Sequence, residues 1–249
     1  MQYGICNLSI VPLRFEPKDT SELVSQVLYG EHFKVIEKRK KWSRIRLAFD
    51  SYEGWIDNKQ YRDISKEEYV IFDNKTPNLT ADLVDFVSCE KDQLIPIPLG
   101  SSLIALDFFK HTFEGQNITK ELPKKNLIET ALLFLNAPYL WGGRTNFGID
   151  CSGFTQMVYK LNGYRLLRDA SLQATQGEPL SFIEEGEPGD LAFFDNDEGI
   201  ITHVGIIMKE NYIIHAHGKV RIDRLDHTGI FNTDTKRYSH QLRVIKKII

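Results

Sequence analysis

The spacing of apolar residues changes near residue 120 of this 249-residue chain, and this change constrains its fold more than any other feature. Before that point, short runs at residues 33–37 and 42–47 alternate apolar and polar side chains. Alternation with a period of two predicts half-buried β-strands. A turn signal at residues 50–51 precedes a third run at residues 52–57, so the spacing predicts a small antiparallel barrel over residues 1–64.

A second β-type stretch runs from about residue 68 to residue 118. Pro96 and Pro98 lie within it, and proline cannot donate a hydrogen bond inside a central strand. The prolines therefore predict strand edges or turns in this stretch. We expect residues 65–120 to form a second small barrel or a linker.

Beyond residue 120 the apolar spacing becomes helical. Residues 126–136 carry an apolar stripe that must end before Pro138, because the residue before a proline disfavours helical geometry. A second apolar stripe follows Asp150 and consists of Phe154, Met157, Val158 and Leu161. Strand-like runs come next, at residues 190–194, 202–208, 212–217 and 242–245. Helices followed by an antiparallel sheet predict an α+β domain over residues 121–249.

The composition excludes several classes of protein. Apolar residues make up 42% and charged residues 26% of the chain, as in soluble globular proteins. The formal net charge of −3 argues against nucleic acid as a partner. No run approaches the roughly 18 apolar residues that a membrane span needs, so we expect no membrane partner. Residues 1–6 have neither a basic segment nor a long apolar core, so we expect a cytoplasmic protein with reduced thiols.

Cys151 is the candidate nucleophile among three cysteines. It follows Asp150, a residue type that favours the N-cap position, and so stands in the first turn of its predicted helix. Backbone N–H groups and the positive end of the helix dipole stabilise a thiolate there. A single cysteine is more often a small buried apolar residue, which is our interpretation of Cys6 and Cys89.

Two histidines give Cys151 a candidate base. A three-residue hairpin loop centred on Lys209 would place His203 directly opposite His215, with both side chains on one face. A neutral imidazole can take the thiol proton, and a second polar group can set its tautomer. Cysteine, base and orienting residue together form a nucleophilic triad.

A metal site is an alternative interpretation of these histidines, because His217 shares a face with His215. Cys151, His203, His215 and His217 could in principle bind zinc. We nevertheless expect neither a metal nor another cofactor. The remaining histidines have no partners by spacing and are interpreted as surface or structural residues: His32, His111, His227 and His240.

Four motifs in this order resemble the NlpC/p60 cysteine peptidases: PYLWGG at 138–143, GIDCSGF at 148–154, HVGI at 203–206 and IHA at 214–216. The first 120 residues resemble bacterial SH3-like domains, mainly through residues 22–31 and 52–55. The resemblance implies a papain-like α+β catalytic domain preceded by one or two small SH3-like β-barrels. The whole layout is similar to the γ-D-glutamyl-L-diamino acid endopeptidases of murein-peptide recycling.

The resemblance also implies roles for individual residues. Cys151 would be the nucleophile, His203 the general base and acid, and His215 the orienting residue. Tyr139 would line the site near the scissile carbonyl, with Asp150 and Ser152 as polar positions on the substrate side. The free amine of the substrate would meet further residues, of which the last is only a loose positional match: Asp169, Tyr52 and Glu22.

The implied activity is hydrolysis of the γ-D-glutamyl-L-diamino acid bond in murein peptides with a free N-terminal L-Ala. The diamino acid could be diaminopimelate or lysine. A second hypothesis is that the enzyme hydrolyses intact peptidoglycan and uses its SH3-like domains to bind the wall. The same layout could also serve a wall-fragment-binding module without activity or an acyltransferase that acts on lipids.

Overall fold

The computed structural model describes residues 2–90 and 93–249, which fall into two compact units. The first unit comprises Met1–Glu121 and Trp141–Asn146, and the second comprises Leu122–Leu140 and Phe147–Ile249. Within the described ranges, no helix is both long and apolar enough to cross a membrane.

The first unit contains a seven-stranded antiparallel sheet. Its strands pair in the order β3-β2-β6-β5-β4-β1-β7. Their bounds are β1 (Gln2–Ile5), β2 (Ile10–Arg14), β3 (Leu23–Leu28), β4 (His32–Lys38), β5 (Trp42–Leu47), β6 (Glu53–Asp57) and β7 (Arg62–Ile64). The three strands predicted from alternation correspond to β4, β5 and β6, although β6 begins at Glu53 rather than at Tyr52. Buried residues of five strands, among them Val11, Val27 and Ile45, form one apolar core inside this sheet.

Residues 65–120 differ from the prediction, because they begin with a helix. Helix α1 (Lys66–Asn74) has a capping box, in which Ser65 accepts a hydrogen bond from the Glu68 backbone and the Glu68 side chain accepts one from Ser65 N–H. The other elements are β8 (Leu79–Thr80), β9 (Val84–Ser88), β10 (Leu94–Pro98), α2 (Leu106–Phe109) and β11 (Asn117–Ile118).

These four short strands close no second barrel within the described ranges. β9 pairs only with β10, and β8 pairs only with β11 among the named strands. Pro96 and Pro98 both lie in β10, where they remove donors that a wider sheet would need. Tyr69 and Phe72 of α1 share an apolar cluster with Tyr3 of β1, so this segment packs as part of the first unit.

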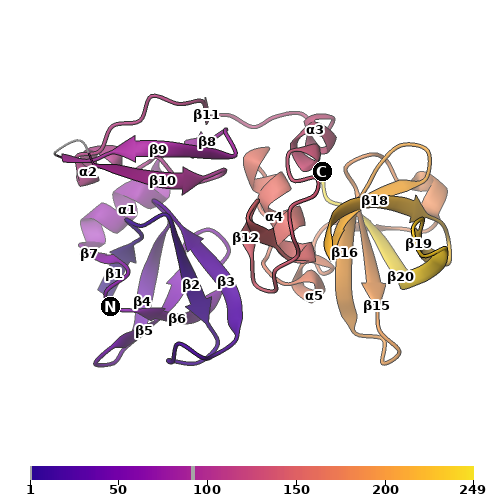
Figure 1. Cartoon of the computed structure of the whole chain (residues 1–249), viewed down its shortest axis with the longest axis horizontal. Coiled ribbons are helices and arrows are strands. Elements are labelled where there is room, and N and C mark those ends of the chain that lie inside the picture. The colour runs from indigo at the N-terminus through magenta and orange to yellow at the C-terminus, as the bar shows by residue number, and fades with distance from the viewer. Residues whose placement is uncertain (1, 91–92) are drawn as a thin grey trace. The chain divides into compact units, whose positions relative to one another are not determined.

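The second unit is an α+β domain, as predicted (Figure 1). Six of its strands form a barrel and pair in the order β20-β15-β16-β17-β18-β19. The barrel is closed because β19 also pairs with β20. Strand β14 pairs with β20 as well. The strands are β13 (Gly148–Ile149), β14 (Glu178–Leu180), β15 (Leu191–Asp195), β16 (Ile201–Ile207), β17 (Tyr212–His217), β18 (Lys219–Leu225), β19 (Gly229–Asn232) and β20 (Arg237–Lys247). Strands β18 and β19 were not predicted.

The helices of the second unit are α3 (Asn126–Leu132), α4 (Cys151–Leu161) and α5 (Ala170–Gln173), with a short 3₁₀ turn at Ile183–Glu185. The predicted helix over residues 126–136 ends early, because successive i→i−3 hydrogen bonds at residues 133–135 replace the α-helical pattern. Helix α4 occupies the predicted position, and all of its residues are buried. It packs against β16 and β17, which carry the candidate histidines.

One short segment departs from the predicted domain boundaries. The segment Trp141–Asn146, expected in the C-terminal domain, groups with the first unit. The buried Arg144 guanidinium donates to both carboxylate oxygens of Glu31, each at 3.0 Å, and to the Gln26 carbonyl at 2.7 Å. A bidentate ion pair of this kind holds the segment through charge and geometry together.

Candidate active site

Cys151 is the first residue of α4, and its thiol is buried with 6% exposure. Asp150 is the N-cap, and its carboxylate accepts a hydrogen bond from Gly153 N–H at 2.6 Å. The Cys151 sulfur lies against the main chain on both sides of His203. It donates to the Thr202 carbonyl at 3.9 Å and accepts a hydrogen bond from the Val204 backbone. The structure therefore brings the predicted nucleophile to the strand that carries the predicted base.

His203 of β16 and His215 of β17 are both buried and bonded to each other. The distance from His203 Nε2 to His215 Nδ1 is 2.8 Å, and the two rings are nearly perpendicular. This pairing of the two side chains agrees with the prediction from the alternation of the strands.

The predicted register of this hairpin was wrong by two residues, because Gly205 rather than His203 lies opposite His215. Met208 N–H donates to the Tyr212 carbonyl, so the loop is centred on Glu210 rather than on Lys209. A shift of two residues keeps both histidines on one face of the sheet. A Cβ atom at Gly205 would lie 2.9 Å from the Cβ of His215, so glycine leaves the space that the diagonal contact needs.

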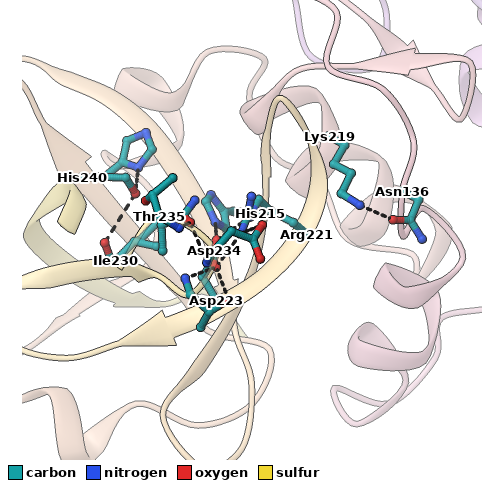
Figure 2. Close-up of polar contacts among 12 residues, drawn as sticks. Asn136, His215, Lys219, Arg221, Asp223, Ile230, Asp234, Thr235 and His240 are labelled. Atoms are coloured by element: carbon teal, nitrogen blue, oxygen red, sulfur yellow. Dashed lines mark hydrogen bonds and ion pairs between the residues drawn. The ribbon is translucent and has the colours of Figure 1, made fainter. Parts of the chain in front are cut away.

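Asp223 of β18 extends this pair, and sequence reasoning missed it. His215 Nε2 lies 3.1 Å from Asp223 Oδ2, and Arg221 Nε donates to the same oxygen at 2.6 Å. Figure 2 shows these side chains together with Asp234, which also accepts a hydrogen bond from Arg221. The signal was present, because residues 219–225 alternate as a strand directly after Gly218.

Burial sets the protonation of the site. It lowers the pKa of His203 well below 6.5, and the neighbouring histidines lower it further. It also lowers the pKa of His215, although the hydrogen bond to Asp223 opposes this effect. Burial, helped by the Asp150 charge, raises the pKa of the Cys151 thiol to about 12 against hydrogen bonds from two backbone N–H groups. The site therefore holds a neutral thiol beside a neutral imidazole, which can act as its base.

Asp150 and Ser152, the predicted polar positions on the substrate side, are both bonded to Arg168. Arg168 donates to the two carboxylate oxygens of Asp150 at 3.0 and 2.7 Å and to the Ser152 hydroxyl at 3.0 Å. Arg168 is buried, and its link to Asp150 fixes the start of α4 from a distant loop. The sequence predicted a role for its neighbour Asp169 but none for Arg168.

Tyr139 and Asp169 both lie in the second unit. Burial raises the pKa of the Tyr139 phenol, and the charges of Cys151 and Asp150 add to this effect, which agrees with a position beside the nucleophile. Asp169 is the N-cap residue of α5 and directly follows Arg168. Contact of either residue with substrate stays a prediction.

Tyr52 and Glu22 belong to the first unit, so their contact with substrate also stays a prediction. Tyr52 is partly buried and packs against the apolar core of that unit. Glu22 is exposed, and its carboxylate accepts a hydrogen bond from the indole N–H of Trp141 at 2.6 Å. The indole therefore supplies one donor to the Glu22 carboxylate.

His240 was interpreted as a residue without a partner, and the structure corrects this. Its ring stacks on His203 with centroids 4.0 Å apart and planes 19° apart. Pairing of β20 with β15 and β19 brings this residue to the site from far along the chain. Two other histidines of that group also have neighbours: His111 is hydrogen-bonded to Tyr29, and His32 Nε2 lies 3.5 Å from a carboxylate oxygen of Asp73.

Three of these histidines could offer nitrogen atoms to a metal. Donor nitrogens of His203, His215 and His240 lie within 4.8 Å of one another. The nearly parallel rings of His203 and His240 direct their lone pairs along parallel planes, whereas zinc needs ligands that converge tetrahedrally. A metal would also displace the bond between His203 and His215. His217, the other ligand considered from the sequence, is exposed at the end of β17.

Comparison with known proteins agrees with this geometry. Residues 136–239 match the NlpC/P60 family, and residues 13–60 match the bacterial dipeptidyl-peptidase SH3 domain. A γ-D-glutamyl-L-lysine dipeptidyl-peptidase of Bacillus cereus is 25% identical over 80% of this chain and 68% of its own length. Dipeptidyl-peptidase 6 of Lysinibacillus sphaericus is 27% identical over 85% of this chain and 87% of its own length.

A solved structure has the same fold. An NlpC/P60 family protein from Bacillus cereus superposes with a TM-score of 0.81, covering 99% of both chains at 21% identity. From the family matches and the named relatives, the chain is a cysteine peptidase that contains an NlpC/P60 domain over residues 136–239 and an SH3 domain of the bacterial dipeptidyl-peptidase type over residues 13–60.

Proposed function

We propose that this peptidase hydrolyses the bond between the γ-carbonyl of D-Glu and the L-diamino acid in murein peptides that carry a free N-terminal L-Ala. The products would be L-Ala-γ-D-Glu and the remainder of the peptide. Two relatives that span most of this chain support the proposal, since both are named dipeptidyl-peptidases and one name specifies a γ-D-glutamyl-L-lysine bond. A role in recycling of released wall peptides, and with it a cytoplasmic location, belongs to the proposal.

The observation that carries the proposal is the placement of the Cys151 sulfur against the main chain around His203, which is bonded to His215. In this arrangement the Cys151 sulfur attacks the γ-carbonyl of D-Glu while its proton passes to His203. Backbone N–H groups at the start of α4 stabilise the oxyanion in this mechanism. The tetrahedral intermediate collapses to a thioester, and His203 gives its proton to the leaving amine of the diamino acid.

Water completes the cycle. His203, neutral again, takes a proton from a water molecule that attacks the thioester carbonyl. Collapse of the second intermediate breaks the carbon–sulfur bond, and the proton returns to the thiolate of Cys151. L-Ala-γ-D-Glu leaves as the acid, which loses its carboxyl proton to the solvent, and the enzyme is regenerated with no net change in its protons.

Acidic and aromatic residues supply the selectivity for a free amine. We assign the ammonium group of L-Ala to Glu22 and Asp169, with Tyr52 over it. A carboxylate has several acceptor positions, so the bond from Trp141 leaves Glu22 able to accept from an ammonium group. An internal peptide would leave such a carboxylate desolvated and unpaired, which is costly.

The test is a digest of L-Ala-γ-D-Glu-L-diamino acid tripeptides beside their N-acetylated forms, analysed by mass spectrometry. Diaminopimelate and lysine versions are compared at equal concentration, and the Cys151→Ala variant is the control. Release of L-Ala-γ-D-Glu from the free peptides alone is the expected result. Equal cleavage of the acetylated peptides would overturn the amine requirement and favour action on intact wall, and no cleavage of either would overturn the proposed bond.

A further inference from the structure

Asp223 is fully buried, and its carboxylate accepts hydrogen bonds from Arg221 and Thr233 and lies against His215. Oδ2 receives His215 Nε2 at 3.1 Å and Arg221 Nε at 2.6 Å. Oδ1 receives Arg221 Nη2 at 2.9 Å together with the backbone N–H and the hydroxyl of Thr233 at 3.1 and 3.3 Å. Burial alone would raise the pKa of Asp223, but these bonds together lower it below its usual value. The carboxylate is therefore ionised and can only accept.

An acceptor at this position determines the tautomer of His215. Its Nε2 must carry the hydrogen that Asp223 receives, as the contact in Figure 2 requires. In a neutral imidazole the other nitrogen then has the lone pair. Nδ1 of His215 is consequently an acceptor, and its partner at 2.8 Å is His203 Nε2.

The tautomer of His203 follows from that of His215. Because His215 Nδ1 accepts, His203 Nε2 must carry a hydrogen. The lone pair of neutral His203 then lies on Nδ1. Nδ1 is thus the nitrogen that can take the proton of Cys151, whose sulfur lies against the main chain on both sides of His203.

We propose that Asp223, held by Arg221, is a positioning residue that selects the tautomers of both histidines and so makes His203 Nδ1 the base. This inference rests on the proposed roles of Cys151, His203 and His215. Once His203 has taken the proton, its Nε2–H still donates to His215, and the Asp223 charge one imidazole away favours the imidazolium. The triad thereby becomes a chain of four residues that ends on the ion pair between buried Asp223 and partly buried Arg221.

The first test needs neither substrate nor a change at Asp223. In the full chain labelled with ¹⁵N-histidine, long-range ¹H–¹⁵N correlation spectra near neutral pH distinguish the two tautomers. The signals are assigned by comparison with His203→Gln and His215→Gln variants. Hydrogen on Nε2 of both residues is expected, and hydrogen on Nδ1 of either would overturn the proposal. A failure of the peptide digest would leave this result readable, so the two proposals can fail separately.

The second test compares two matched substitutions. Asp223→Asn replaces one carboxylate oxygen by an amide donor, which must face either His215 or the donors of Arg221 and Thr233. We therefore expect mixed tautomers of His215 and a kcat about 10- to 100-fold lower. Asp234→Asn makes the same chemical change on the exposed side of Arg221, and we expect unchanged tautomers and a kcat within about twofold. Unchanged tautomers and kcat in a folded Asp223→Asn variant would overturn the proposal. If that variant does not fold, the spectrum of the unaltered chain decides.

Discussion

Cys6 in the first unit and Cys151 in the second are both buried, and burial raises the pKa of each thiol to about 12. They differ in what the sulfur contacts. Cys6 lies in the apolar core, where its thiol donates to the carbonyls of Leu8 and Val27. Carbonyl oxygens cannot take a proton at neutral pH, whereas Cys151 lies at the start of a helix and against the strand of His203. A neighbouring base, rather than the resting pKa of the thiol, therefore distinguishes a nucleophilic cysteine from a structural one.

Replacement of each thiol gives the largest expected contrast. Cys151→Ala should lower kcat by at least about 10⁴-fold with the fold intact, since no other group can form the thioester. Cys6→Ala should leave kcat unchanged and lower the free energy of unfolding by about 1 kcal/mol through a small cavity. Peptide cleavage and urea unfolding measure the two effects. Activity above a few per cent in Cys151→Ala would contradict the assignment of the nucleophile.

Alkylation of the folded protein sharpens the same comparison. With iodoacetamide at pH 8, Cys151 should be modified at least about 100-fold faster than Cys6, because Cys6 reacts only when its core opens. His203→Gln should slow the labelling of Cys151 and leave that of Cys6 unchanged. Peptide mapping by mass spectrometry follows each site. Equal rates for the two cysteines would remove the distinction between them.

Gly205→Ala tests the space between the histidines. Its Cβ would lie 2.9 Å from the Cβ of His215 and 2.7 Å from the Ile213 side chain, so β17 must shift. A misplacement of this size should lower kcat about 10- to 100-fold. Gly199→Ala is the control, because its left-handed φ of +76° also causes strain but its Cβ would meet nothing within 4 Å. Loss of stability in both variants with loss of kcat only in Gly205→Ala is expected, and equal kcat in both would contradict the argument.

The smallest expected effect is on the pH dependence of stability. Burial, followed by the neighbouring histidines, lowers the pKa of His240 to about 3, so the folded chain stays uncharged there while the unfolded chain binds a proton below about pH 6.5. Unfolding is therefore favoured as the pH falls from 7 to 5. His240→Gln should remove about 1 to 2 kcal/mol of that loss, as measured by urea unfolding at both pH values. A pH dependence in His240→Gln equal to that of the unaltered chain would contradict the prediction.

Sequence reasoning was most accurate where the determinants are local. Asp150 lies three residues before Gly153, the donor that it caps, so the start of α4 at Cys151 could be predicted. The alternation of residues in β16 and β17 placed His203 and His215 on one face. The register failed because the loop is centred one residue further along, with Glu210 and Asn211 both at positive φ, which the short polar loop did not indicate.

The helix α1 was missed for a different reason. Its Ser65 and Glu68 form a capping box that could have been recognised in the sequence, but the surrounding β-type runs outweighed it. Strand β18 was missed in the same way, although its alternation is visible after Gly218. In both cases a short local pattern received less weight than the different pattern of the residues around it.

Local patterns in the sequence were enough to predict the α+β class of the second unit, the helix that presents Cys151 and the shared face of the two histidines, because caps and periodicity act over a few residues. The folded chain was needed to show that Asp223 bonds to His215, that Arg168 bonds to Asp150 and that His240 stacks on His203. The stacking of His240 depends on closure of the barrel, which brings β20 beside β15, and each pKa then depends on the burial that follows. No spacing along the chain encodes either one directly.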